Sequence, residues 1–268
     1  MTTTDETTTS DAAAHEHPYT LAIDIGGTGL KANVLDATGG VVADRVRVPT
    51  TYPLPPTEMV EKLKGLADKL PAFDRISAGF PGMVRHGHVL TAPHFVCESG
   101  PGSKVEPKLL KDWTDFDMAT ALTQALGQPA RVANDADVQG LAVINGNGFE
   151  AVITLGTGFG SAFFMDRNLL PHMEFAQVEF RKGETFNIQL GEATRKDIGD
   201  KRWNKRVQKA IAYLDTLTTF DHLYIGGGNG ARVNRSDLGD VLERVTVVDN
   251  AAGILGGIKL WEDQHLTV

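Results

Sequence analysis

Residues 20–29, Thr20-Leu21-Ala22-Ile23-Asp24-Ile25-Gly26-Gly27-Thr28-Gly29, join a short apolar run to a glycine-rich turn. The apolar run predicts a strand over residues 20–25 that is buried apart from Asp24. The glycines predict a turn whose backbone N–H groups a ligand can approach closely. Residues 30–35 and 41–48 predict two further strands. This part of the chain is therefore expected to form an antiparallel meander.

The same pattern returns in the second half of the chain. Residues 151–155 predict a strand, Leu155-Gly156-Thr157-Gly158-Phe159-Gly160 a second glycine turn, and residues 160–165 the strand that leaves it. Three glycines at alternate positions, with a threonine among them, suit close backbone approach to an anion. The echo of residues 20–35 predicts two similar halves, each of which offers a phosphate-binding turn to a shared cleft.

The first glycine turn allows two interpretations. In the functional one, Asp24 faces a metal-bound water and Thr28 donates its hydroxyl to a phosphate; in the other, the turn is a plain hairpin. A carboxylate at the end of an apolar strand is costly unless it is paired, which favours the functional interpretation. The turn matches neither the Gly-x-Gly-x-x-Gly dinucleotide fingerprint nor a P-loop, which requires Gly-Lys-Ser/Thr.

Between the two turns stands Asn134-Asp135-Ala136-Asp137, after an apolar run and before a helix expected over residues 138–144. A carboxylate at a helix start lies beside free backbone N–H groups and the positive end of the helix dipole. This placement predicts that Asp135 stays ionised and accepts a proton from a bound hydroxyl. A helix cap alone would also explain Asn-Asp. Phosphoryl transfer needs one carboxylate for the acceptor, hydrogen-bond donors around the phosphate and a bridging metal, and Asp135 fits the first role.

Three further segments carry polar groups of uncertain purpose. Glu174-Phe175-Ala176-Gln177-Val178-Glu179 offers two carboxylates and an amide for sugar hydroxyls, or forms a solvated loop. Gly226-Gly227-Gly228-Asn229 follows a strand and either lets a nucleotide base lie flat on the backbone or simply turns the chain. Residues 181–209 hold nine basic and four acidic side chains. In a chain of net charge −8, this basic region is either a solvated helix face or a track for a polyanion near the cleft.

The remaining elements follow from periodicity and caps. The expected helices cover residues 58–70 (capped by Thr57), 115 or 117 to 126, 201–217 and 251–261 (capped by Asn250). The expected strands cover residues 75–80, 222–225 and 245–248. Residues 91–105 are expected to form an irregular loop at the cleft edge, and residues 181–200 show no clear pattern.

Composition narrows the class of protein. The chain has 268 residues, 41% hydrophobic and 22% charged, which is typical of a globular protein with one large domain or two small ones. The net negative charge argues against general binding to nucleic acid or anionic membranes. The single cysteine, Cys97, forms no intrachain disulfide and belongs to no Cys/His metal pattern, so a cytoplasmic location is expected. Residues 1–18 resemble neither a signal nor a transit peptide and are expected to be a disordered tail.

Taken together, these motifs resemble the ROK family of sugar kinases, within the sugar kinase/actin/Hsp70 superfamily. The resemblance covers residues 19–261 and looks closest to the polyphosphate glucokinases of that family. Its carriers are Asp24-Ile25-Gly26-Gly27-Thr28, Gly79-Phe80-Pro81-Gly82-Met83-Val84, Asn134-Asp135, Leu155-Gly156-Thr157-Gly158-Phe159-Gly160 and Ile225-Gly226-Gly227-Gly228.

The resemblance implies an α/β fold of two RNase H-like (actin/hexokinase-type) domains with a cleft between them. The first domain would cover residues 19–133 together with a C-terminal helix at about 251–263, and the second residues 134–250. The expected reaction transfers a phosphoryl group from polyphosphate, and often also ATP, to the 6-hydroxyl of glucose with Mg²⁺, in a homodimer. Two alternatives stay open: another hexose or an amino sugar as acceptor with ATP as donor, and a sugar- or phosphate-binding sensor with little catalysis.

The resemblance also assigns roles to residues. Asp135 would be the catalytic base, and Asp24 would hold Mg²⁺ through water. The sugar-binding residues would be Asn134, Glu174, Gln177, Glu179 and Gly82. The donor-binding residues would be Asp24, Gly26, Gly27, Thr28, Lys31, Gly156, Thr157 and Gly158, with Gly227 and Gly228 facing an adenosine. The basic charge of the expected helix, and not the resemblance, suggests a polyphosphate track of Lys201, Arg202, Lys205 and Arg206.

Several departures accompany the resemblance. Many family members have Gly-His, which touches the sugar, where this chain has Ala176-Gln177. The zinc-binding Cys-x-Cys-Gly-x-x-Gly-Cys signature of many relatives is absent, so no structural zinc is expected. No helix-turn-helix precedes Tyr19 in this sequence, so a role as a repressor is not expected.

Overall fold

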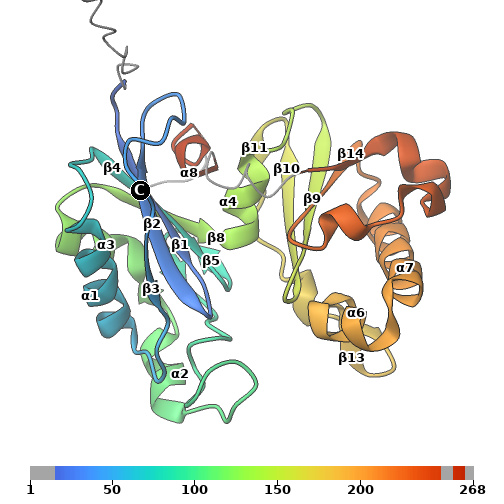
Figure 1. Ribbon diagram of the computed structural model, residues 1–268, viewed down its shortest axis with the longest axis horizontal. Coiled ribbons are helices and arrows are strands. Elements are labelled where there is room, and N and C mark those ends of the chain that lie inside the picture. The colour runs from blue at the N-terminus through green and yellow to red at the C-terminus, as the bar shows by residue number, and fades with distance from the viewer. Residues whose placement is uncertain (1–15, 249–255, 263–268) are drawn as a thin grey trace, which may run out of the picture.

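The computed structural model describes residues 16–248 and 256–262 and divides into two lobes, each built on a five-stranded sheet (Figure 1). Most of the predicted tail, and the predicted cap of the last helix at Asn250, lie outside the described residues. Residues 16–18, which were expected to belong to the tail, contact the first lobe: the Glu16 carbonyl accepts a hydrogen bond from Ala37 N–H, and His17 bonds Asp74 at 2.8 Å.

The first sheet has the strand order β3-β2-β1-β4-β8. Strands β1 (Thr20–Ile25), β2 (Gly29–Leu35) and β3 (Val46–Pro49) are antiparallel, while β4 (Arg75–Phe80) and β8 (Ala130–Asn134) run parallel to β1. The predicted meander is thus confirmed. Its third strand is shorter than expected because the chain makes only an isolated bridge at Val41 before β3 begins.

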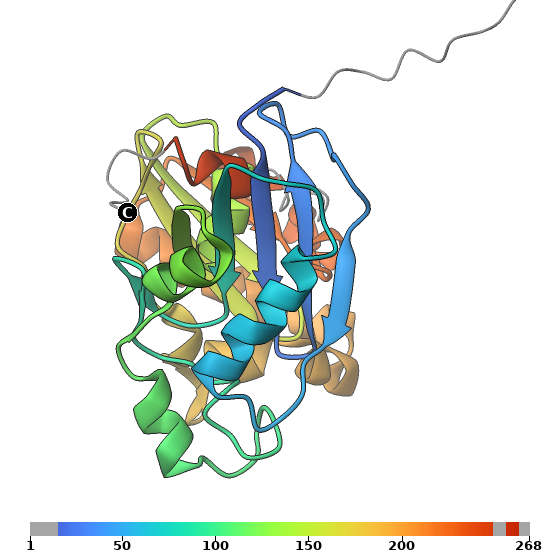
Figure 2. The ribbon, with the colours of Figure 1, turned by 90° about the vertical axis from the view of Figure 1, so that its left-hand side faces the viewer.

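Helices cover the outer face of this sheet, the face turned away from the second lobe (Figure 2). They are α1 (Pro56–Ala67) and α3 (Met118–Leu126). Helix α2 (Pro107–Trp113) lies below the sheet in Figure 1, and a small sheet of β5 (Val84–Arg85), β6 (His88–Val89) and β7 (Phe116–Asp117) adjoins α3. The predicted Thr57 cap of the first helix is wrong, because α1 begins at Pro56. Proline suits the first helical position, where an N–H would have no partner inside the helix.

The second sheet repeats the first, with the order β11-β10-β9-β14-β15. Strands β9 (Phe149–Leu155), β10 (Phe159–Met165) and β11 (Asn168–Leu169) form the antiparallel part, and β14 (His222–Gly226) and β15 (Val245–Val247) add in parallel. The two sheets therefore share strand order and direction, which confirms the predicted repeat.

The outer side of the second lobe is covered by α7 (Asp200–Thr218), which matches the predicted amphipathic helix. Its apolar face is buried, and the fully buried Trp203 donates from Nε1 to the Leu190 carbonyl at 2.8 Å. The segment that had no clear pattern forms short elements: 3-10 helix η1 (Phe175–Gln177), hairpin β12 (Glu179–Arg181) and β13 (Glu184–Thr185), and helices α5 (Phe186–Leu190) and α6 (Glu192–Ile198). Three short 3-10 helices, η2 (Gly230–Arg232), η3 (Arg235–Asp237) and η4 (Gly239–Arg244), link β14 to β15.

Two helices lie between the sheets, α4 (Asp135–Leu141) and α8 (Gly256–Lys259) (Figure 1). Glycines allow close approach here: a Cβ on Gly140 would lie 2.6 Å from the Phe164 ring, and one on Gly256 would lie 1.7 Å from the Val138 carbonyl. Helix α8 also contacts β1 and β4 of the first lobe, and Ser77 Oγ donates to the Gly257 carbonyl.

In the part of the chain that the structure describes, no helix combines the length and apolar character needed to cross a membrane.

The third glycine turn generates a stability prediction. Gly227 has φ +83°, and a Cβ there would lie 2.3 Å from the Leu155 carbonyl; Gly239 has φ +60°, and a Cβ there would meet nothing within 4 Å. Gly239→Ala should lower the free energy of unfolding only by the cost of a left-handed backbone at alanine, about 1–2 kcal/mol. Gly227→Ala must also displace β9, so we expect it to lower the free energy of unfolding by about 1–3 kcal/mol more. Urea denaturation measures both losses, and equal losses would contradict the proposed close contact.

Candidate functional site

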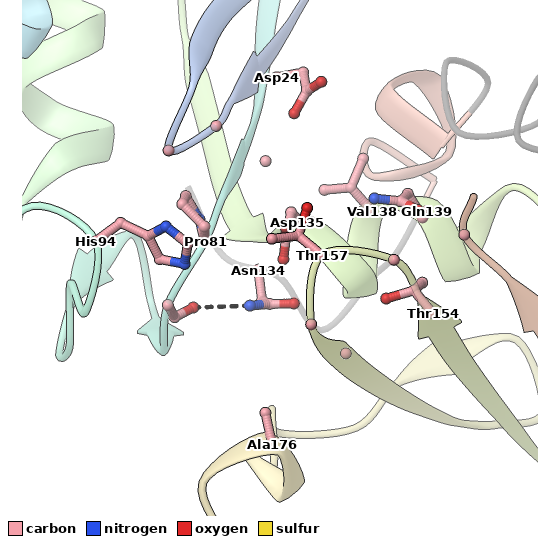
Figure 3. A pocket seen from close by; sticks show the side chains of 18 of the residues that line it. Asp24, Pro81, His94, Asn134, Asp135, Val138, Gln139, Thr154, Thr157 and Ala176 are labelled. Carbon is pink, nitrogen blue, oxygen red and sulfur yellow. Dashed lines mark hydrogen bonds between the residues drawn. The ribbon is translucent and has the colours of Figure 1, made fainter. Parts of the chain in front are cut away.

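A cavity of about 1110 Å³ lies between the two lobes and is lined by both. It brings together most of the residues predicted for the site. Those lining it are Asp24, Gly26, Gly27, Thr28, Lys31, Gly82, Asn134, Asp135, Gly156, Thr157, Gly158, Glu174, Gln177 and Gly227. In Figure 3, Asn134 and Asp135 lie between His94 and Pro81 on one side and Thr154 on the other.

The two glycine turns hold similar positions in their lobes. Each joins the first two antiparallel strands of its sheet and closes on itself: Gly26 N–H donates to the Gly29 carbonyl at 3.1 Å, and Gly156 N–H to the Gly158 carbonyl at 3.0 Å. The second turn is braced from α5, because Asn187 Oδ1 accepts a hydrogen bond from Phe159 N–H at 3.0 Å. The glycines of both turns line the cavity, so their backbone is available for contact with phosphate oxygens.

Asn134 fixes the start of helix α4. Its Oδ1 accepts from Ala136 N–H at 2.7 Å, and its Nδ2 donates to the Gly82 carbonyl at 3.0 Å (Figure 3). The helix therefore begins at Asp135, earlier than the predicted residue 138, because the Asn134 side chain satisfies an N–H of the first turn. The same amide holds Gly82 against the cavity floor.

Asp135 differs from the sequence-based expectation. The helix start was expected to keep it ionised, yet its pKa is raised to about 7. Burial is the largest cause, and the charges of Asp24, Asp137 and Glu174 act in the same direction. The bond from Ala136 N–H to Asp135 Oδ1 (2.9 Å) opposes this shift but does not cancel it. A carboxylate with a pKa near 7 is suited to general-base catalysis at neutral pH.

His172 is a cavity residue that the sequence did not identify. Its Nδ1 donates to Asp137 Oδ1 at 3.0 Å, and both side chains are only 3% exposed. Burial alone would lower the pKa of His172, but the hydrogen bond to Asp137 and the nearby Glu174 carboxylate outweigh it and raise the pKa to about 10. The sequence signal was Asp137 itself, since a carboxylate on the buried side of a helix needs a charged partner.

His94 is a second unforeseen cavity residue, from the segment expected to be only an irregular loop. Its Nδ1 is buried without a hydrogen-bond partner among the described residues. A Cβ on Gly27 would lie 2.4 Å from this atom, so the ring contacts the first glycine turn directly. Burial lowers the pKa of His94, which leaves the ring neutral at pH 7.

Several charged side chains of the cavity belong to the first lobe. Lys31 Nζ is 2.7 Å from Asp24 Oδ2, across the β1–β2 pair. Arg45 also lines the cavity, with no carboxylate partner among the residues that the structure describes. Within those residues, no three His, Cys, Asp or Glu side chains form a direct metal site. Asp24 and Asp135 nevertheless face one cavity and interact electrostatically, a carboxylate pair that fits Mg²⁺ held largely by waters and donor phosphates.

Some predicted site residues lie elsewhere. Glu179 is exposed in the β12–β13 hairpin, where it accepts a hydrogen bond from Gly183 N–H at 2.9 Å; this bond commits it to the turn and away from the cavity. Gly228 also lies outside the cavity lining, although Gly227 belongs to it. The basic residues Lys201, Arg202, Lys205 and Arg206 of α7 do not line the cavity either, because α7 packs behind α5 and α6.

The polyphosphate glucokinase of Mycobacterium tuberculosis (strain H37Rv) is 27% identical over 269 residues, covering 96% of each protein. The crystal structure of inorganic polyphosphate/ATP-glucomannokinase from Arthrobacter sp. strain KM has a TM-score of 0.71 at 29% identity, covering 90% of this chain and 97% of that one. N-acetylmannosamine kinase of Escherichia coli (strain SE11) is 30% identical over 156 residues, 56% of this chain and 49% of that protein.

These similarities confirm the two-domain, actin/hexokinase-type α/β fold that the motifs implied. The family model for ROK matches residues 20–173, which is more than half of the sequence and includes both glycine turns and Asn134-Asp135. The chain therefore belongs to the ROK family.

Proposed function

We propose that this chain, a sugar kinase, transfers a phosphoryl group from polyphosphate or ATP to the 6-hydroxyl of a hexose, with glucose the favoured acceptor. The observation that carries the proposal is Asp135, a half-buried carboxylate with a pKa of about 7 that lies in one cavity with both glycine turns. The names of the similar proteins, polyphosphate glucokinase and polyphosphate/ATP-glucomannokinase, support the same choice of donor and acceptor.

In this mechanism the acceptor hydroxyl lies against Asp135, which takes its proton as the phosphoryl group moves in line. Backbone N–H groups of the Gly26 and Gly156 turns stabilise the charge on the transferring group. Asp24 is the residue that would hold Mg²⁺ through water, in the same cavity as Asp135, and the ion would supply positive charge to the phosphates of the donor. Glu174 and Gln177 hold the sugar from the second lobe.

Two sets of cationic side chains are candidates for binding the part of the phosphoryl donor that lies beyond the reacting phosphate. Lys31 and Arg45 line the cavity, so they serve either donor. The α7 residues Lys201, Arg202, Lys205 and Arg206 lie beyond the cavity, where only a long polyanion would reach them.

Two other functions are tested by the same experiment. The exposed Gln177, where many relatives have histidine, favours a sugar-binding sensor with little catalysis. The similarity to N-acetylmannosamine kinase favours an amino sugar as acceptor. A panel of hexoses and amino sugars crossed with ATP and polyphosphate, with a coupled assay for the sugar 6-phosphate, separates all three functions.

Sedimentation of the purified protein checks the homodimer that the resemblance implies.

The role of Asp135 generates a direct prediction. Asp135→Asn is expected to lower kcat about 10²- to 10⁴-fold, because the acceptor hydroxyl loses its base. Sugar affinity, measured by titration calorimetry, should change little. Asp112→Asn is the matched control, since among the described residues Asp112 pairs only with Lys108, at the surface. Near wild-type turnover in Asp135→Asn would rule out the proposed base.

The raised pKa of Asp135 predicts a dependence on pH. The carboxylate must be ionised to accept a proton, so kcat/KM should fall about tenfold per pH unit below pH 7. In the metal-free protein the charge of Asp24 helps to raise this pKa, so Asp24→Asn should lower the pKa of the Asp135 carboxyl. Titration of this carboxyl by carbon-13 NMR in both metal-free proteins tests the coupling, and an unchanged pKa would contradict it.

The donor assignment predicts different losses for the two cationic groups. Replacing Lys201, Arg202, Lys205 and Arg206 by glutamine should raise KM for polyphosphate more than KM for ATP. The difference should grow at low salt, where screening is weaker. Arg45→Gln should weaken both donors alike, because both place phosphates in the cavity. An equal loss of both donors in the α7 variant would overturn the polyphosphate track.

A further inference from the structure

We propose that His172 and Glu174 bind one hydroxyl group of the acceptor sugar between them. In this arrangement the hydroxyl oxygen accepts a hydrogen bond from His172 Nε2, and its hydrogen is donated to Glu174 Oε2. The inference rests on the proposed sugar kinase function and deepens it, because it names the pair that recognises the acceptor.

His172 Nε2 and the Glu174 carboxylate leave room between them for one shared hydrogen-bond partner. Its Nε2 is buried and has no hydrogen-bond partner among the described residues. The nearest carboxylate oxygen, Glu174 Oε2, is 3.8 Å away, which is too long for a hydrogen bond. One oxygen atom placed beside both would lie within hydrogen-bond distance of each. Since both residues line the cavity, a bound ligand can supply that atom.

The orientation of the imidazole ring is fixed from its other side. Nδ1 is held by Asp137 Oδ1 at 3.0 Å, and Asp137 belongs to helix α4, two residues after Asp135. Two carboxylates beside the ring keep it protonated, so Nε2 carries a hydrogen to donate. The ring is therefore a preorganised donor whose position relative to Asp135 is set by a single helix.

The surrounding charges favour a hydroxyl over a phosphate. Asp135 and Glu174 line this end of the cavity, while Asp137 balances the charge of His172, so the exposed carboxylates repel anions. A hydroxyl both accepts and donates a hydrogen bond, so it satisfies the His172 N–H and the Glu174 carboxylate together. An acceptor that lacks this hydroxyl would leave a buried charged group unpaired, and such losses are expensive.

The test measures sugar binding without any phosphoryl donor. Titration calorimetry compares glucose with each of its monodeoxy analogues on the wild-type protein and on His172→Phe. In wild type, one analogue other than 6-deoxyglucose should bind about 10- to 100-fold more weakly than glucose. In His172→Phe, glucose itself should weaken by a similar factor, and the difference between glucose and that analogue should shrink to within about twofold.

A purely structural role of His172 gives a different pattern. It would weaken all sugars alike and preserve the difference between glucose and the analogue, which would overturn the inference. His172→Phe leaves Asp137 unpaired and is liable to misfold; the double variant Asp137→Asn with His172→Phe removes that charge and then serves in its place. His222→Gln is the matched control, because His222 is bonded to Thr246 outside the cavity. It should keep the wild-type profile.

The outcome also distinguishes the inference from the function on which it rests. If the wild-type protein binds no sugar and forms no sugar phosphate, the proposed function and the inference both fail. If it phosphorylates glucose but binds every monodeoxy analogue other than 6-deoxyglucose as well as glucose, only the shared hydroxyl is refuted.

Discussion

The start of helix α4 is the constraint on which the rest of the structure depends. Asn134 closes β8 of the first lobe, caps the helix and holds Gly82, and the helix then packs against β10 of the second lobe. One turn of helix thus fixes Asp135 and Asp137 between the lobes. Burying two carboxylates so close together is costly, and the structure offsets this cost differently for each. Asp137 is paired with His172, whereas Asp135 keeps a raised pKa that suits a base.

Features encoded in contiguous residues were predictable from the sequence. The glycine turns, the antiparallel meander and its repetition follow from local periodicity and from the backbone freedom of glycine, and the structure agrees on all three. Asp135, the proposed base, was also identified from local sequence, because a carboxylate stands where an apolar run ends and a helix begins. Residues 181–200 were not predictable, since their short helices depend on burial against α7 rather than on a pattern of their own.

Contacts between distant residues were out of reach of the sequence. His172 meets Asp137 across 35 positions, and His94 meets the Gly27 turn from a loop with no regular period. Conversely, Glu179 belongs to the same short motif as Glu174 but points into a hairpin instead of the cavity, because η1 and β12 turn the chain between them. Chemical type and spacing therefore identified candidates, while only the packing of the two lobes decided which of them meet.

The glycines between the lobes have a mechanical consequence. At three points α4 and its neighbours approach without interlocking side chains: Gly140 meets the Phe164 ring, Gly256 meets the Val138 carbonyl and Gly160 meets Ala136. Helices that interlock through long side chains resist sliding, because ridges must climb out of grooves. The side chains of Val138 and Leu141 still hold the helix in an apolar cluster shared with the second lobe. A change in the separation of the lobes by shear along α4 would therefore have to repack these two side chains, and it would move the Asp135 carboxylate together with the helix.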